Sequence, residues 1–504
     1  MKVDTNCLGA RIMKDFRRII LMLLALIFGC TSHNSGEAST QKKEKAIHNL
    51  LKNDTTYYSI VEAMEESGLI GLSVAVFEDY KIVWKDSWGI KEVATDEKID
   101  GNTAFSTASI SKPITATLFA VLEEKGLIDL KAPVSGYLKR WKLPDSKFLK
   151  DTVLTLEHLL SHTAGTTQGG FVDFYEGDTI PTIVHSLKGQ IPGYDTEIDF
   201  VFVPGTWWKY SGGGYVIAQM AIEDHLGRSL AHLAEEHLFM PLGLKNTTMR
   251  QPNEEGFPSN VAKAHDENGK TIRTGIPITP QVSASGLWST PTDMSLFLIE
   301  MQNALRNEGN TVISHNVSQR VTEIVTSKVM GGWSLGWERR YGFGNYEWFS
   351  HGGANTGIGG HIYGTMDGGN GMAFFGNGPN GNRIPVLDKF KSSIIKAHGW
   401  YLPMDRKNEQ EVPDDFISWA TGNYQDVLFD VEIEIISNDK KLLMAPSFLG
   451  KEYSELIYIG DSTFLMDEFP NKIKFERNPT DSLMYMALIR NGTFKKEYTL
   501  QKRE

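Results

Sequence analysis

The clearest pattern of apolar and polar positions along the chain lies in residues 104–126. Apolar side chains recur there every three or four residues, as on one face of a helix, at Ile114, Leu118, Val121 and Leu122. Pro113 has no backbone N–H and is tolerated in a first helical turn, and Gly126 suits the position after a last turn. We therefore predict a helix that begins near Ser109 and runs to residue 125.

Strand-like and helical patterns surround this helix in a definite order. Short apolar runs predict strands at 72–77, 81–85, 333–338, 346–349, 361–365 and 372–375. Helical spacing and terminal residues predict helices at 55–67, 154–162 and 215–225, and from Pro291 onward after a capping box that Thr290 begins. Because strands lie at both ends and helices between them, residues 55–400 are predicted to form an α/β (α+β) domain. Its antiparallel sheet would be assembled from both ends around an inserted helical portion.

The pattern changes after residue 400. Residues 401–415 are charged and contain prolines, which is typical of a domain boundary. Alternation beyond them predicts strands at 431–436, 441–444, 456–459, 463–466, 472–475, 484–489 and 497–500, and Asn491-Gly492 is a dipeptide typical of hairpins. Residues 401–504 are therefore predicted to form a small antiparallel β domain of barrel type.

Composition narrows the class of protein. With 504 residues, of which 41% are hydrophobic and 11% aromatic, the chain is long enough for two or three domains with a large core. The net charge is −11, and no basic run lies beyond the N-terminal region, so binding to nucleic acid is not expected. Both cysteines, Cys7 and Cys30, precede the predicted domains, which leaves these domains without a disulfide or a cysteine-based metal site.

The first 30 residues have the pattern of an export signal. Basic residues precede an apolar run at 19–28, which is too short to span a bilayer. Ile27-Phe28-Gly29-Cys30 resembles the bacterial lipobox, in which the cysteine is lipidated and becomes the mature N-terminus. We expect an exported protein of the cell envelope or periplasm that touches the membrane only through a lipid anchor on Cys30, with residues 31–54 as a tether. An ordinary secretory signal with an incidental cysteine is the alternative.

Three short motifs carry candidate chemistry. Ser109 and Lys112 lie one helical turn apart, and a buried lysine at that spacing can take the proton of a serine hydroxyl. Tyr210-Ser211-Gly212 precedes a helix, and a phenol beside an ammonium can act as a general base. His351-Gly352-Gly353 lies between strands, where glycines let a ligand approach the backbone. Taken alone, each motif is better explained by an ordinary structural role: a solvated lysine for the first, a packed tyrosine for the second and a structural histidine for the third.

In this order the three motifs resemble those of the penicillin-recognising serine hydrolases, which include class C β-lactamases, D-alanyl-D-alanine carboxypeptidases, D-aminopeptidases and related esterases. The resemblance covers about residues 55–400. It implies a β-lactamase/DD-peptidase-like fold, an antiparallel sheet flanked by helices with a helical subdomain. The predicted C-terminal barrel resembles accessory domains of some D-aminopeptidase-like members. Residues 166–200, which lack periodicity, are typical of a loop that covers a site.

The resemblance also implies residue roles. Ser109 would be acylated, while Lys112 and Tyr210 would shuttle its proton and that of the leaving group. The N–H groups of Ser109 and Ala354 would form the oxyanion hole. Other substrate-binding positions would be Ser211, Gly212, His351, Gly352 and Gly353. No metal or cofactor is implied, and the oligomeric state is left open.

Two positions depart from the family pattern. The second motif usually ends in Asn, which contacts the acylamide of the substrate, but here it ends in Gly212. His351 stands where many β-lactamases have Lys. The sequence therefore predicts a serine hydrolase that acts through an acyl-enzyme on an ester or an amide, with D-amino-acid peptides among the candidates. A true β-lactamase or D-alanyl-D-alanine carboxypeptidase is one alternative, and a non-catalytic lipoprotein that binds wall peptides is another.

Overall fold

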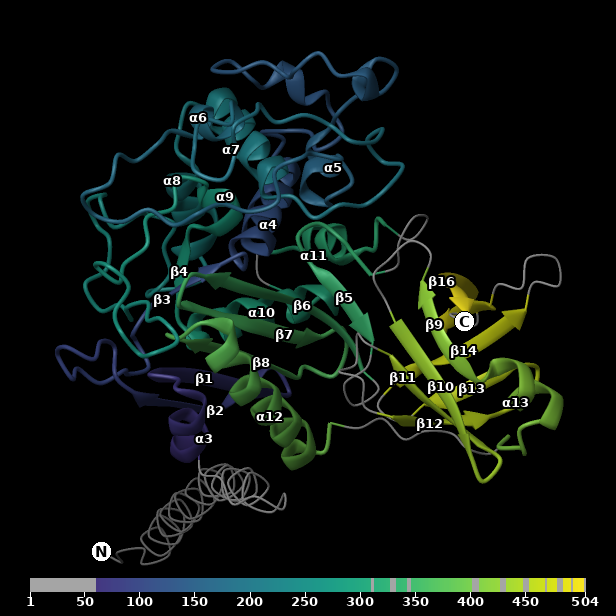
Figure 1. The fold of residues 1–504 in the computed structure, drawn as a ribbon. Coiled ribbons are helices and arrows are strands. Elements are labelled where there is room, and N and C mark those ends of the chain that lie inside the picture. The colour runs from purple at the N-terminus through teal and green to yellow at the C-terminus, as the bar shows by residue number, and fades with distance from the viewer. Residues whose placement is uncertain are drawn as a thin grey trace, which may run out of the picture.

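The structure, a computed structural model, describes residues 60–309, 312–326, 332–341, 346–400, 408–426, 432–446, 453–466, 469–477, 484–490 and 493–502. The expectations for residues 1–59, including the lipidation of Cys30, lie outside these residues. Within the described ranges no helix has both the length and the apolar character needed to cross a membrane. Figure 1 shows a larger part built on a mixed helix-and-strand framework and a smaller part built of strands.

The larger part is built on a six-stranded antiparallel sheet in the order β2-β1-β8-β7-β6-β5. These strands are β1 (Gly71–Glu78), β2 (Lys81–Gly89), β5 (Glu338–Tyr341), β6 (Glu347–Asn355), β7 (Ile358–Thr365) and β8 (Gly371–Gly376). Strand β1 pairs with β8 from Leu72↔Gly376 to Phe77↔Gly371. The prediction that the sheet is assembled from both ends of this region is therefore confirmed.

Both faces of the sheet are covered. Because side chains alternate along a strand, Met372 and Phe374 of β8 face one layer of helices, while Ala373 and Phe375 face the other. The first layer contains α3 (Ile60–Ser67) and α12 (Asn380–His398), and the second contains α10 (Pro291–Leu305), as Figure 1 shows. The predicted flanking of the sheet by helices is thus confirmed.

The inserted helical portion lies on the α10 side. It contains α4 (Ser111–Glu124), α5 (Leu156–Leu160), α6 (Ile183–Leu187), α7 (Gly212–Leu226), α8 (Leu230–Ala234), α9 (Val282–Ser285) and α11 (His315–Thr322), with short pieces η1 (Val134–Gly136), η2 (Lys147–Leu149) and η3 (Glu235–Phe239). Two short strands, β3 (Phe105–Ala108) and β4 (Leu287–Ser289), pair beside them. Every residue of α4 from Ser111 to Leu122 is buried, so this helix is surrounded on all sides.

Two local predictions differ from the structure. The short apolar run at 333–338 predicts a strand, but the segment folds as a turn closed by Ser334 N donating to Trp337 O, and β5 begins only at Glu338. Gly336 there has a φ of +75° and lies against α4, where a Cβ would come within 2.8 Å of Lys112 O. The start of α10 forms only half of the predicted capping box. Thr290 accepts from Asp293 N as predicted, but the Asp293 carboxylate does not reach back to the Thr290 backbone and accepts from Asn246 N and the Thr247 hydroxyl.

The smaller part consists of α13 (Asp414–Ala420) and strands β9 (Gly422–Asp426), β10 (Glu432–Asn438), β11 (Lys441–Pro446), β12 (Ser454–Tyr458), β13 (Thr463–Met466), β14 (Phe469–Arg477), β15 (Met484–Arg490) and β16 (Thr493–Lys502). Each strand is antiparallel to the next, and β16 pairs with β9, so the curled sheet closes into a barrel. The predicted barrel is therefore confirmed. Asn491 and Gly492 lie outside the described residues.

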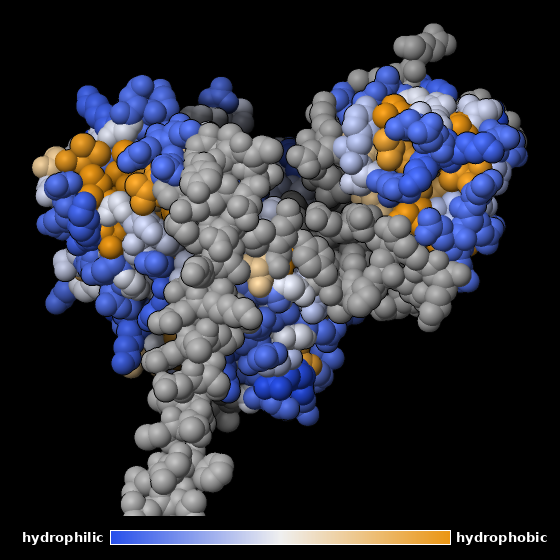
Figure 2. All heavy atoms as spheres, turned by 90° about the horizontal axis from the view of Figure 1, so that it is seen from below, coloured by the Kyte–Doolittle hydropathy of each residue, from blue (hydrophilic) through white to orange (hydrophobic). Residues whose placement is uncertain are grey.

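The described surface is mostly hydrophilic on the face shown in Figure 2, with smaller hydrophobic areas on both parts. Large exposed apolar side chains are scattered among loops and helices, for example Val93, Val172 and Met240. Scattered apolar side chains of this kind are ordinary for a globular surface.

Candidate active site

Ser109 lies in the sharp turn between β3 and α4. Ala108, directly before it, has a φ of +48°, in the left-handed region that non-glycine residues rarely adopt. Ser109 is partly exposed, whereas the neighbouring Ser106 and Ser111 are buried. Ser111 Oγ donates to Ala108 O (2.6 Å) and accepts from Leu287 N (2.8 Å), so its hydroxyl is committed to holding the turn. The predicted helix thus begins at Ser111, two residues later than expected, and leaves Ser109 accessible.

Lys112 lies directly behind this serine. Its side chain is only 2% exposed, and Nζ lies 3.0 Å from Ser109 Oγ and 2.8 Å from Ala284 O. The ammonium group is also 4.9 Å from the centre of the Tyr210 ring and 5.7 Å from that of Tyr215. Ring faces at such distances attract a cation. In the described part of the chain Lys112 makes no ion pair, so carbonyl, hydroxyl and ring contacts surround it.

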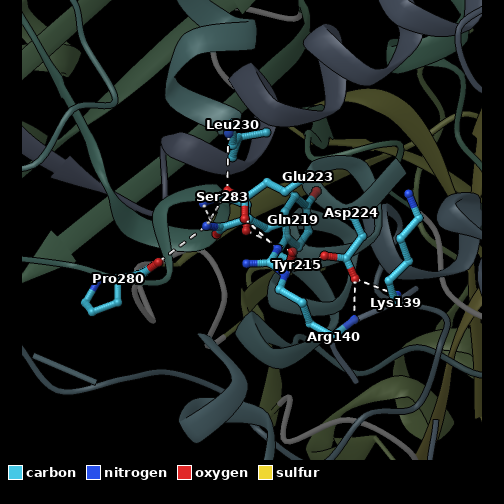
Figure 3. A network of polar contacts seen from close by, with 9 residues as sticks. All are labelled: Lys139, Arg140, Tyr215, Gln219, Glu223, Asp224, Leu230, Pro280 and Ser283. Atoms are coloured by element: carbon cyan, nitrogen blue, oxygen red, sulfur yellow. Dashed lines mark hydrogen bonds and ion pairs between the residues drawn. The ribbon is translucent and has the colours of Figure 1, made fainter. Parts of the chain in front are cut away.

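The Ala284 carbonyl is fixed by hydrogen bonds between α7 and α9. Ser283 N donates to Gln219 Oε1 (3.1 Å), and Ser283 Oγ donates to Tyr215 O (2.8 Å). Gln219 in turn contacts Glu223, as the sticks in Figure 3 show. Farther along α7, Asp224 accepts from the backbone N–H groups of the 139–140 segment. This network positions the carbonyl that binds Lys112.

Tyr210 reaches the lysine from the residue before the N-cap of α7. Ser211 forms that cap by accepting from Gly214 N (3.1 Å), and its hydroxyl donates to Gln168 O (2.6 Å). The Tyr210 ring lies 4.3 Å from the ring of His162 and 5.9 Å from that of Trp333. The first and second motifs are therefore brought together around Lys112.

His162 is a site residue to which the sequence analysis assigned no role. It is buried, and its Nδ1 accepts from Ser211 N (3.1 Å), which places the ring under Tyr210. Burial above all, and then the charges of Lys112 and His351, hold its pKa well below the usual value. A neutral imidazole therefore supports the second motif.

The third motif lies on β6 and packs against the turn between β3 and α4 that contains Ser109, called the nucleophile turn below after the role proposed for this serine. A Cβ on Gly353 would lie 2.0 Å from Thr107 O and 2.9 Å from Ser109 N, so only glycine fits there. His351 Nδ1 is 2.6 Å from Gly352 O, and its ring lies 5.9 Å from that of Trp333. All three motifs thus meet at Ser109.

The geometry of β6 also orients the predicted oxyanion donor. Strand β5 pairs with β6 only over residues 347–350, which leaves the following residues at an open edge. A Cβ on Gly359 of β7 would lie 2.2 Å from Gly353 O, so this carbonyl points toward β7. In a trans peptide the N–H points the opposite way, so the Ala354 N–H points toward the open edge of β6.

Gly212 is packed against the loop that was predicted to cover the site. Its N–H donates to Gly169 O (2.7 Å), and a Cβ there would lie 2.8 Å from that oxygen and 2.9 Å from the Phe171 ring. The loop thus fills the space that a side chain at position 212 would need. A few residues further along the same loop, Asp173 binds the β6–β7 turn, where Thr356 N donates to Asp173 Oδ2 (2.7 Å). Burial raises the pKa of Asp173.

Comparison with known proteins identifies the class. Residues 59–390 match the Beta-lactamase family, and because this is more than half of the 504 residues, the chain belongs to that family of serine hydrolases. The same framework occurs in the solved structure of SurE (20% identity, 92% of this chain and all of that one, TM-score 0.56). It also occurs in the octameric penicillin-binding protein homologue from Pyrococcus abyssi (18% identity, 88% and 98%, TM-score 0.55).

Curated relatives are similar over shorter stretches. A penicillin-binding protein of Bacillus subtilis is 30% identical over 195 residues, 38% of this chain and 40% of the relative. A beta-lactamase of Pseudomonas fluorescens is 28% identical over 46% and 59% of the two chains. The teichoic acid D-alanine hydrolase of Staphylococcus aureus is 26% identical over 54% and 65%. The chain therefore spans less than two thirds of each of these relatives.

Proposed function

We propose that this protein hydrolyses a carboxylic ester or amide through a covalent acyl-enzyme on Ser109. The observation that carries the proposal is the 3.0 Å contact between the partly exposed Ser109 hydroxyl and the buried Lys112 amine. A nucleophile in contact with a base that a further group orients is the arrangement that covalent catalysis needs. Here the Ala284 carbonyl orients the base.

The reaction would proceed in two halves. Ser109 Oγ attacks the substrate carbonyl carbon, and its proton passes to the Lys112–Tyr210 pair. The negative oxygen of the tetrahedral intermediate accepts from the N–H groups of Ser109 and Ala354, each donor being worth about 3–4 kcal/mol. The bond to the leaving group then breaks, and this group takes the proton from the same pair. In the second half a water molecule gives a proton to the same pair as its oxygen attacks the acyl carbon. The bond between that carbon and Ser109 Oγ then breaks, the carboxylic acid leaves, and Ser109 Oγ takes the proton back from the pair.

We further propose that short-chain esters, including esters of D-amino acids, are better substrates than β-lactams. Gly212 offers no side-chain amide to an acylamide, and the loss of such a hydrogen bond weakens binding by about 0.5–1.5 kcal/mol. The loop at Gly169 and Phe171 narrows the same side of the site. One relative is named for the hydrolysis of D-alanine from teichoic acid, which supports esters as substrates. An exported, lipid-anchored enzyme would meet such substrates at the cell envelope.

Labelling with a fluorescent fluorophosphonate tests the proposal. We expect stoichiometric labelling of the wild type, none of Ser109→Ala, and retained labelling of Ser106→Ala, because Ser106 is buried and its Oγ accepts from Asn355 Nδ2 (2.8 Å). Mass spectrometry that places the adduct on another serine would refute the assignment. The purified enzyme is then offered p-nitrophenyl esters, D-alanyl esters and peptides, and nitrocefin. Faster turnover of nitrocefin than of every ester would favour a true β-lactamase, and binding of wall peptides without labelling would favour a non-catalytic receptor.

A further inference from the structure

Arg383 is a buried cation beneath the strand that carries the third motif. It lies in α12 and is 0% exposed. Its guanidinium group passes under two glycines, where a Cβ on Gly359 would lie 2.9 Å from Nη2 and one on Gly376 would lie 3.2 Å from Cδ. Side chains at these two positions would collide with Arg383, so the glycines of β7 and β8 leave the space that the buried arginine fills.

The charge of Arg383 is balanced by dipoles. Nη1 donates to Gly378 O (2.8 Å), and Nη2 donates to Asn380 Oδ1 (2.5 Å) and Gly353 O (3.4 Å). Within the described ranges no carboxylate forms an ion pair with it, and its buried Nε has no hydrogen-bond partner. Burial lowers its pKa to about 10, so the group is still a cation at neutral pH. A buried charge without a counter-ion is costly, and an apolar side chain of similar size would avoid that cost.

The contact with Gly353 O connects Arg383 to the proposed oxyanion hole. Gly353 O and the Ala354 N–H belong to one peptide unit, whose two dipole ends point in opposite directions. A cation at the carbonyl end draws electron density through the peptide and strengthens the hydrogen bond that the N–H donates at the other end. The carbonyl end faces Arg383 and β7, while the N–H end faces the open edge of β6, where the proposed function places the negative oxygen of the intermediate.

We propose that Arg383 is a positioning residue that holds and polarises the Gly353–Ala354 peptide, so that the Ala354 N–H binds the negative oxygen of the tetrahedral intermediate more strongly. This inference rests on the proposed function, because it concerns the same reaction. Arg383 has no exposed surface and acts through the peptide without touching the substrate. Removal of one oxyanion donor lowers the rate by about 10²- to 10³-fold, so cooperative strengthening of that donor by about 10–30% corresponds to about a two- to eightfold change in rate.

The test compares Arg383→Met, which keeps the volume without the charge, with Arg383→Lys, which keeps the charge. Lys391→Met is the matched control, because Lys391 lies on the same helix, is also buried, and pairs with Asp388 (2.7 Å). An alkyl boronic acid is the probe, since its tetrahedral serine adduct places an oxygen in the oxyanion hole. We expect Arg383→Met to lower kcat and boronate affinity in parallel by about two- to eightfold, with KM unchanged. Arg383→Lys and Lys391→Met should stay near the wild type.

The outcomes separate the two proposals. Wild-type protein that binds neither boronate nor fluorophosphonate contradicts the proposed function itself. A wild type that reacts, together with an Arg383→Met variant that folds and retains both kcat and boronate affinity, overturns the role of Arg383. Should the Met variant fail to fold, Arg383→Gln, a neutral donor, is compared with Arg383→Lys. Equal boronate affinity in these two variants also overturns the proposal.

Discussion

Replacement of Gly353 by alanine tests the contact on which the whole site depends. The new Cβ would lie 2.0 Å from Thr107 O and 2.9 Å from Ser109 N, while real Cβ atoms essentially never approach within 3.0 Å of such atoms. Both atoms belong to backbone, so neither can rotate away. Strand β6 and the nucleophile turn would have to separate by about 1 Å, the difference between 3.0 and 2.0 Å.

The expected cost follows from that displacement. A shift of about 1 Å in the relative position of a nucleophile and its oxyanion donor lowers the rate by roughly 10²-fold, or about 2.7 kcal/mol. Overpacking of the same contact should reduce the free energy of unfolding by about 1–3 kcal/mol. We therefore expect Gly353→Ala to remain folded at 25 °C but to acylate about a hundred times more slowly.

Stopped-flow measurement of the p-nitrophenol burst gives the acylation rate, and a thermal melt gives the stability. Gly381→Ala is the control, because a Cβ at that position meets nothing within 4 Å. It should behave like the wild type in both assays. If Gly353→Ala keeps its acylation rate within threefold of the wild type and melts at the same temperature, close packing of β6 on the nucleophile turn does not set the geometry of the site.

Four further outcomes are expected. Tyr210→Phe should slow acylation by about 10²-fold or more, the scale for loss of a general base, and wild-type activity across pH would contradict its role. Gly212→Asn should lower the melting temperature, because its Cβ would meet Gly169 O at 2.8 Å. A variant that melts like the wild type and turns over more nitrocefin relative to ester would show that the loop leaves room for a side chain at position 212. The pKa of His162 is lowered in the folded protein, so below pH ~6.5 the imidazole is protonated in the unfolded chain but not in the folded one. The free energy of unfolding therefore falls as the pH is lowered, by up to about 1.4 kcal/mol per pH unit. Denaturant midpoints from pH 7.5 to 5.5 should therefore show a shallower fall for His162→Asn, and equal slopes would contradict the buried neutral imidazole. Cys30→Ser should release the protein from the membrane fraction, and unchanged fractionation would leave only the plain secretory signal.

Much of the fold follows from local pattern. Alternating and apolar runs located β1, β2, β6, β7, β8 and most of the barrel strands, and terminal glycines located the ends of α4 and α7. Helix α12 was not predicted, because Pro385 and the Asn- and Gly-rich start around residue 380 conceal it. The wrongly predicted strand at 333–338 shows a related difficulty, since a short run of buried apolar side chains occurs both in strands and in a turn packed against a helix.

Only those residues of the site that belong to short sequence motifs could be predicted. Ser109, Lys112, Tyr210 and His351 were proposed from short patterns, and the structure brings these four residues together. His162 could not be placed under Tyr210, because that neighbour depends on tertiary packing. The burial of Arg383 could not be predicted, because an arginine usually lies at the surface. Its buried position depends on glycines that lie on two strands outside helix α12.

The pairing of β1 with β8 also determines when the enzyme can become active during synthesis. Leu72 lies opposite Gly376, so the β1–β8 pair in the interior of the sheet closes only after most of the chain has been made. Gly353 of β6, which packs against the backbone of Ser109, belongs to the same late segment. Contacts between such distant residues form slowly, because a long loop must be closed before they stabilise anything. A nascent chain that carries only Ser109 and Lys112 therefore lacks the proposed oxyanion donor on Ala354, and under the proposed function hydrolysis would begin only after the third motif has been translated.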